Sequence, residues 1–187
     1  RLLWVANVDG KNGEFTIWRC DLKSGAYAPW ERKSPDGRNV LDLPIRDRDG
    51  LAQCRAIAVR EGRLAVILAA ERKVLLLDAG TGDQTGELVN LPEGLAALAF
   101  RHDGQLLLAA GDKLWLADPS GGPAQVLASG LDDPRSIAVD ARGAIYVSQR
   151  GRTMGVAVFS AQGTPSRVIG KAGGRPASGF FDGQGML

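Results

Sequence analysis

The chain has 187 residues, with 23 basic and 21 acidic side chains, so its formal net charge is only +2. The 44% apolar content is enough for a hydrophobic core, and the balanced charge excludes a disordered acidic tail and a general nucleic-acid-binding arm. No apolar run approaches the roughly 18 residues of a membrane span, and no basic start followed by an apolar stretch indicates a signal peptide.

Two strands are predicted near the N-terminus, at 3–6 and 15–20. The second ends at Asp21 and leads into a turn at Gly25. These strands match the second and third strands of a unit that recurs downstream, so the first unit lacks its opening strand. The segment 31–53 is polar, is interrupted by proline and glycine, and carries roughly 17 residues more than the period of the repeat requires. It is predicted to be a loop.

A repeat of about 40 residues occupies the rest of the chain. Three apolar triplets at 57–59, 98–100 and 137–139 are spaced 41 and 39 residues apart, and each leads into a glycine turn. Each triplet is predicted to be a first strand. The second strands are predicted at 64–68, 106–109 and 145–148, the third at 74–78, 114–118 and 156–160, and the fourth at 87–91, 125–127 and 167–169.

Each third strand ends at a polar residue, Asp78, Asp118 or Ser160, that begins another glycine turn. The side-chain oxygen of Asp or Ser at this position accepts hydrogen bonds from the turn backbone. Glycine makes up 25 of the 187 residues, about twice its usual share of roughly 7%. Regularly recurring hairpin turns account for most of this excess.

Four short strands in each ~40-residue unit are typical of a β-propeller blade. The sequence therefore predicts an all-β fold, a β-propeller with four-stranded antiparallel blades. About four blades are expected, at 1–50 (incomplete), 51–94, 95–132 and 133–170, followed by a glycine-rich loop at 171–187. That loop has no strand pattern to complete the first blade. A segment of a longer, incomplete ring is the favoured interpretation, and a closed four-blade ring is the alternative.

The last repeat carries the most specific motif. Pro134, the run Ile137-Ala138-Val139-Asp140 and Gly143 resemble the NHL repeat, and 159–163 is similar to the end of its third strand. The tail resembles the long loops of large bacterial NHL-type proteins, and the two preceding repeats match in outline. The resemblance implies a propeller and a location outside the cytoplasm, extracellular or periplasmic. It does not imply a particular activity.

Candidate binding residues gather on one face of the predicted propeller. Strand direction alternates, so the loops before the first strands and between the second and third strands share this face, which we call the entry face. Arg55 and Arg135 each stand two residues ahead of a triplet, and acidic residues are mixed among the basic ones. Two interpretations stay open: a site for an anionic or polar partner at the channel mouth, or solvated charges paired with acids. The other basic candidates are Arg72, Lys113, Arg150 and Arg152.

The aromatic residues differ in whether they are expected to be buried or exposed. Trp4, Trp18, Trp115 and Tyr146 fall in second or third strands and are expected to pack between blades. Trp30, beside Pro29, is a candidate ligand contact for a sugar or peptide at the rim if it is exposed, and a packing residue otherwise.

Four further features are weak as sites. The calcium-like segment 47–50 lacks the required flanking ligands, and the glycines of 80–86 have the wrong spacing for a dinucleotide site, so they are interpreted as a hairpin turn. Cys20 and Cys54 are expected to be separate thiols. The only histidine, His102, lies in a turn on the opposite face and by itself forms neither a metal site nor a Ser-His-Asp group. No metal and no cofactor is predicted.

The function that these features favour is a non-catalytic binding or scaffold module that presents entry-face loops to a protein, peptide or glycan. The alternative is part of a propeller hydrolase or lyase, similar to lactonases or strictosidine-synthase-like enzymes, with catalytic residues partly in other blades. A purely structural repeat in an envelope protein is a third interpretation. The small net charge and the scarcity of aromatic residues on the entry face argue against RNA.

Overall fold

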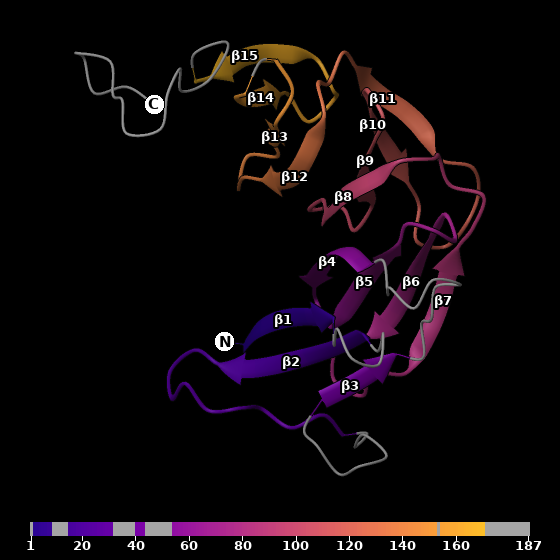
Figure 1. Ribbon diagram of the computed structural model, residues 1–187, viewed down its shortest axis with the longest axis vertical. Helices are drawn as coiled ribbons and strands as arrows, with labels where there is room; N and C mark the ends of the chain where they lie inside the picture. Colours follow the sequence, from indigo (N-terminus) through magenta and orange to yellow (C-terminus); the bar gives the residue numbers. More distant parts are fainter. Residues whose placement is uncertain (1, 9–14, 32–39, 44–53, 153, 171–187) are drawn as a thin grey trace. The chain divides into compact units, whose positions relative to one another are not determined.

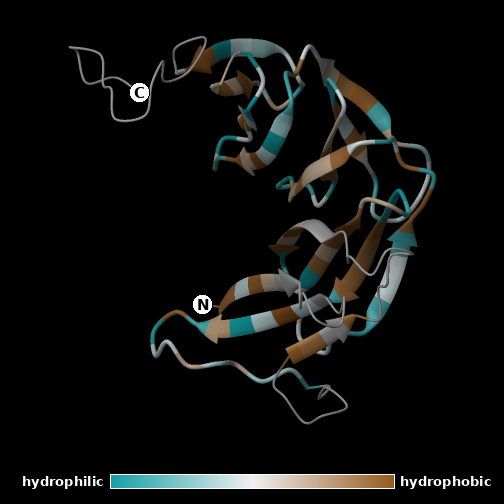
Figure 2. Ribbon diagram, in the orientation of Figure 1, coloured by the Kyte–Doolittle hydropathy of each residue, from teal (hydrophilic) through white to brown (hydrophobic). Residues whose placement is uncertain are grey.

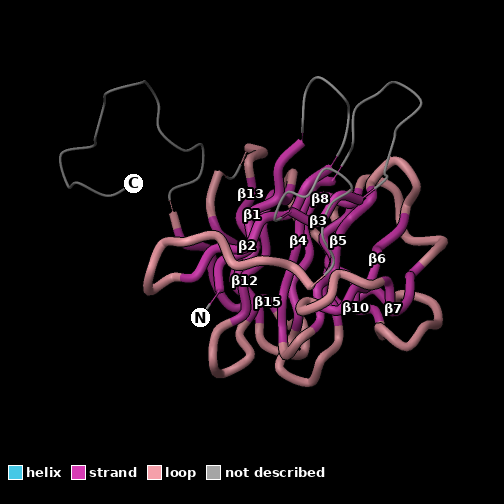
Figure 3. The backbone as a smooth tube through the Cα atoms, turned by 90° about the horizontal axis from the view of Figure 1, so that it is seen from below, coloured by secondary structure: helices cyan, strands magenta, loops and turns pink. Residues whose placement is uncertain are grey.

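The computed structural model describes residues 2–8, 15–31, 40–43, 54–152 and 154–170. Within these ranges every element is a β-strand (Figures 1 and 3). We find no helix there of the length and apolar character needed to cross a membrane. The strands form four sheets, and neighbouring strands in each sheet are antiparallel and consecutive in sequence.

The first sheet has three strands, β1 (Leu2–Val8), β2 (Phe15–Asp21) and β3 (Val40–Leu43). The second has four: β4 (Cys54–Arg60), β5 (Arg63–Leu68), β6 (Lys73–Asp78) and β7 (Gln84–Leu88). The third consists of β8 (Leu95–Phe100), β9 (Leu106–Ala110), β10 (Lys113–Ala117) and β11 (Gln125–Ser129). The fourth consists of β12 (Pro134–Val139), β13 (Ile145–Gln149), β14 (Val156–Phe159) and β15 (Pro165–Ile169).

The predicted blade pattern is confirmed, with each sheet folded as a meander of short strands. By contact between residues the chain divides into two compact units, Arg1–Asn90 and Leu91–Leu187. The first unit holds the sheets β1–β3 and β4–β7, and the second holds β8–β11 and β12–β15.

Two predicted segments need correction. The segment 31–53, predicted to be a loop, contains the strand β3, whose Val40, Leu41 and Leu43 are buried. The polar residues on either side hid this short apolar strand. The fourth strand of the second blade is β7, three residues earlier than predicted. In β7 only Leu88 is buried. Figure 2 shows this outer strand mostly in teal and white, the colours of hydrophilic and intermediate residues, so it lacks an apolar pattern.

Each unit has its own apolar core, built where two sheets face each other. In the first unit Ile17 from β2 and Leu41 from β3 join Leu64 and Val66 from β5, with Trp4 packed against this cluster as expected. In the second unit Leu107 and Ala109 from β9 pack with Ile145 and Val147 from β13. Burial of such alternating side chains provides most of the stabilisation that holds blades together.

A buried arginine links the two blades of the first unit. Nη1 of Arg19, on β2, donates hydrogen bonds to the carbonyl oxygens of Ala79 (2.7 Å) and Gly80 (3.1 Å) in the turn after β6. Its Nη2 donates to the Pro29 carbonyl. Burial lowers the pKa of the Arg19 guanidinium from its usual value, and the carbonyls compensate for part of the lost hydration.

Trp30 completes this arrangement and is not an exposed rim residue. Its ring is 3% exposed, lies 4.1 Å from the guanidinium carbon of Arg19, and donates a hydrogen bond from Nε1 to the Ile17 carbonyl at 3.0 Å. Of the two alternatives for Trp30, the structure shows the packing role. The nearby exposed ring is that of Tyr27, which contacts Trp18.

Candidate functional site

The second unit carries a surface hollow on the entry face. It has a volume of about 320 Å³ and is lined by residues from the first positions of β8 and β12, from the loops before these strands, and from the β9–β10 turn. This volume is at the lower end of the range typical of ligand sites. The walls are small or apolar apart from two carboxylates. They comprise Gly94, Ala96, Gly111, Leu131 and Pro134 together with Asp112 and Asp133.

Backbone hydrogen bonds hold the loop before β12 in place. The Leu131 amide donates to the Asp112 carbonyl in the β9–β10 turn (2.9 Å), and the Arg150 amide donates to the Asp133 carbonyl (3.0 Å). The Asp132 amide donates to Oε1 of Gln149, a buried side chain, at 2.6 Å. This loop is therefore tied both to the neighbouring blade and to the β13–β14 loop of its own blade, which fixes one wall of the hollow.

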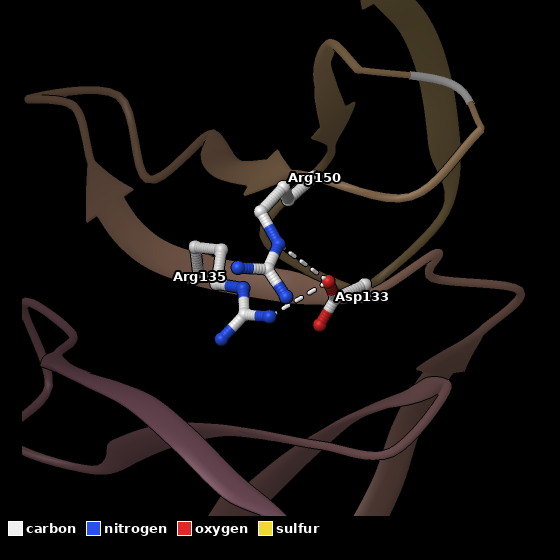
Figure 4. Close-up of polar contacts among 3 residues, drawn as sticks. All are labelled: Asp133, Arg135 and Arg150. Atoms are coloured by element: carbon white, nitrogen blue, oxygen red, sulfur yellow. Dashed lines mark hydrogen bonds and ion pairs between the residues drawn. The ribbon is translucent and has the colours of Figure 1, made fainter.

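Asp133 binds the side chains of two arginines beside this wall. Its Oδ2 accepts a hydrogen bond from Nη2 of Arg135 at 2.7 Å and another from Nε of Arg150 at 3.0 Å (Figure 4). The hydrogen bond from Arg135, followed by that from Arg150, lowers the pKa of Asp133 from its usual value. Asp133 adopts a left-handed backbone conformation with φ 54°, which Asp tolerates better than most residues. One carboxylate therefore holds two cations, and the cluster keeps one positive charge in excess.

The structure brings Arg135 and Arg150 together as members of one cluster. Their side chains are 36% and 67% exposed, so both reach solvent while they contact Asp133. The arginines therefore have a feature of each interpretation: they pair with an acid, as solvated loop charges do, and they lie beside a hollow, as residues of a binding site do. The sequence separates them by a whole hairpin, and strand pairing between β12 and β13 removes that separation.

Lys113 and Arg152 are not part of this cluster. Lys113, next to Asp112, places Nζ 5.8 Å from the centre of the Trp115 ring. Arg152 is exposed in the β13–β14 loop. Arg72 is exposed in the β5–β6 turn of the first unit, where it has interactions of its own. Arg55 lies in β4, but its side chain is outside the described residues.

Sequence reasoning missed the residues that form the hollow itself. Asp112 and Asp133 are among the acidic residues mixed with the basic ones in the entry-face loops, and both line it. Gly94, Ala96 and Gly111 leave the space empty because they carry little or no side chain. A usable signal was present: small residues cluster at the start of the third blade and in its β9–β10 turn, both on the entry face.

The remaining sequence motifs have simple structural outcomes. Residues 80–82 form part of the predicted hairpin turn, with Oδ1 of Asp78 accepting hydrogen bonds from the amides of Gly80 (2.8 Å) and Thr81 (2.7 Å). Cys20 is a free, half-buried thiol. The segment 47–50 and the side chain of Cys54 lie outside the described residues.

His102 lies in the β8–β9 turn, at the opposite end of the sheet from the hollow. It is exposed, and its Nε2 is 2.6 Å from the carbonyl oxygen of Asp140. In the part of the chain that the structure describes, no three His, Cys, Asp or Glu residues are grouped so as to hold a metal ion.

Comparison with known proteins identifies the fold alone. No family model matches the sequence, and no curated protein matches it. Among solved structures, a nidogen/laminin complex superposes with a TM-score of 0.67 at 18% identity, over 89% of this chain and 60% of that one. Glutaminyl cyclase from Myxococcus xanthus has a TM-score of 0.57 at 18% identity, over 83% of this chain and 62% of that one. Hydrazine synthase from Kuenenia stuttgartiensis has a TM-score of 0.56 at 19% identity, over 72% of this chain and 40% of that one.

These similarities support the β-propeller assignment. The chain spans 40% to 62% of the length of the three solved structures. With sequence identities below 20%, the similarity does not extend to activity, and the neighbours include both a binding complex and an enzyme.

Proposed function

We propose that the chain is part of a non-catalytic binding module that holds a protein or peptide segment on its entry face. The observation that supports this most directly is the hollow beside Asp133, because a concave surface sits next to two exposed, positioned arginines. Exposed arginines and small apolar pockets are common where proteins bind peptides. Trp30 is buried and is therefore not a rim contact for a sugar or a peptide, so the proposal rests on the hollow and the two arginines.

We also propose that the module is of the NHL type and works outside the cytoplasm, as the resemblance of 133–147 implies. Asp140 and Gly143, two of the residues that carry this resemblance, lie in the turn after β12. Oδ1 of Asp140 accepts hydrogen bonds from the amides of Arg142 and Ala144, both at 2.9 Å, around Gly143. The partial coverage of longer propellers is consistent with a chain segment that belongs to a larger ring.

The test is to fill the hollow. Ala96 lines it and is half-buried, so Ala96→Leu is expected to occupy the space without changing charge. We expect peptides selected from a random dodecapeptide library on the full chain to bind the Ala96→Leu variant about tenfold more weakly in fluorescence polarisation, a loss of about 1.4 kcal/mol.

The matched control is Ala141→Leu, the same change at an exposed position in the β12–β13 turn, at the other end of the blade. Its affinity is expected to equal that of the unmodified chain, and circular dichroism checks that both variants fold. A library that yields no binding peptide, or equal binding by both variants, contradicts the proposal.

A further inference from the structure

We infer that the hollow selects a peptide segment in which an aliphatic side chain is flanked on one side by an acidic residue. This inference rests on the proposed function and specifies its ligand. The aliphatic side chain enters the hollow, the acidic side chain binds Arg135 and Arg150, and Asp112 disfavours a second acid on the other side.

The walls of the hollow are suited to an aliphatic side chain. Ala96, Leu131 and Pro134 contribute apolar surface, and Leu131 is itself part of the core of the second unit. The volume of about 320 Å³ accommodates a side chain with its adjoining backbone. Removal of an apolar side chain from water is the main favourable contribution in such a pocket.

The arginine pair supplies the acidic preference. A guanidinium has five N–H donors, and in the part of the chain that the structure describes Arg135 and Arg150 each give one to Oδ2 of Asp133. Their other donors have no protein partner among the described residues, and the two side chains are 36% and 67% exposed, so part of each guanidinium is open to a ligand. A carboxylate is the matching acceptor because it forms short, charge-assisted bonds with a guanidinium fork. Asp133 holds both groups in position, so binding costs less side-chain entropy than it does at two unrestrained arginines.

Asp112 makes the preference directional. It lines the hollow from the β9–β10 turn, in the other blade, and is exposed. Among the described residues no ion pair involves its carboxylate, and Nζ of the neighbouring Lys113 lies 5.8 Å from the centre of the Trp115 ring. A second acid in the ligand would meet this charge, whereas a basic or neutral residue would not. The ligand is therefore acidic on the arginine side only.

The experiment is a selection of random dodecapeptides, displayed without a free C-terminus, on the full chain and on three variants. The Arg135→Ala/Arg150→Ala double variant removes the arginine pair. Arg142→Ala is the matched control, because Arg142 is an exposed arginine in the opposite turn. Asp112→Asn tests the direction. Circular dichroism verifies folding, and Arg150→Ala alone, at the more exposed position, replaces the double variant if that one is unfolded.

We expect the unmodified chain and Arg142→Ala to enrich the same motif, an acid next to an aliphatic residue. In a selected peptide, Glu→Gln should weaken binding about tenfold, and the arginine double variant should abolish that difference. Asp112→Asn should bind peptides with acids on both sides several-fold more tightly than the unmodified chain does.

Two failures are distinguishable. Peptides that bind through the hollow, as judged by loss with Ala96→Leu, but that show no acidic preference overturn this inference and leave the proposed function standing. Failure to enrich any peptide overturns both.

Discussion

Asp133 is the residue on which the candidate site depends, because its carboxylate joins the loop before β12 to the two arginines. A salt bridge between exposed groups is usually weak, so its value here lies in orientation. It restricts two long side chains that would otherwise sample many rotamers beside the hollow.

The pH dependence of this cluster can be measured. Arg135, and to a lesser extent Arg150, lowers the pKa of Asp133, so the folded-state pKa is below the unfolded value of about 3.9. The stabilisation from this cluster is therefore complete above the unfolded pKa and is lost as the pH falls through the folded pKa. We expect Arg135→Ala to raise the pKa of Asp133 toward its usual value in a carboxyl ¹³C NMR titration from about pH 2 to 7, and Arg150→Ala to raise it less.

Asp118 serves as the internal control in this titration. Hydrogen bonds from Ser120 lower its pKa, and neither arginine is among the causes. An Asp133 titration midpoint that does not move in Arg135→Ala would show that the pair is not formed in solution.

The polar residues at the ends of third strands show which hydrogen bonds can be predicted from the local sequence. Asp21, Asp78 and Asp118 each accept hydrogen bonds from amides two or three residues ahead, and Ser160 does the same in the last blade. These contacts depend only on neighbouring residues, so sequence sufficed to predict those at Asp78, Asp118 and Ser160. The packing of Trp30 against Arg19 could not be predicted from neighbouring residues in this way. Arg19 is held by carbonyls in the turn after β6, which are distant in sequence.

At the level of elements, blades differ in how tightly the turn after the third strand packs. In the last blade, a Cβ on Gly163 would overlap the carbonyl oxygen of Leu127, in strand β11 of the adjacent blade. At Gly25, in the equivalent turn of the first blade, a Cβ would have no atom of the described residues within 4 Å. Both have a positive φ, 81° and 71°, so backbone strain is similar and the packing differs.

Alanine at these two glycines is expected to have different costs. Gly25→Ala should lower the free energy of unfolding by about 1 kcal/mol, from the left-handed backbone alone. Gly163→Ala should lower it by about 2 to 4 kcal/mol, because a backbone carbonyl cannot move aside as a flexible side chain does. Urea unfolding monitored by tryptophan fluorescence gives both values. Equal costs would mean that β11 and this turn are not in contact.

The elements themselves were largely predictable. Of the fifteen strands in the described residues, fourteen are predicted from apolar runs between glycine turns, although β7 is predicted three residues too late. The exception, β3, is a short apolar strand within a polar segment, where its pairing with β2 outweighs the local pattern. Outer strands are the hardest to locate, since β11 and β15 are mostly exposed and carry no clear alternation.

At the scale of the whole molecule, the charge balance determines how strongly the protein attracts a charged partner. A net charge of +2 over 187 residues gives little attraction for a polyanion, and the arginine pair at the hollow is partly neutralised by Asp133. Stable binding of single-stranded RNA requires a continuous basic groove together with several stacking rings. The entry face of the second unit has a small hollow instead.

We therefore expect a labelled twelve-nucleotide single-stranded RNA to bind only weakly, with a Kd of about 100 µM or above at about 0.15 M salt, the weak end of non-specific binding. Fluorescence polarisation measures this directly, with a strongly basic peptide as positive control. Saturable binding at low micromolar RNA would contradict this expectation and favour a nucleic-acid partner over a peptide.

The sequence by itself determined the fold class, the repeat period and most of the strands, because these depend on local signals: apolar runs, glycine turns and Asp side chains that bond to nearby amides. Only the tertiary structure brought Arg135 and Arg150 onto one carboxylate, buried Trp30 against Arg19, and left a hollow between Asp112 and Asp133. Those arrangements join residues from different strands and blades, and the packing that joins them has no period in the sequence.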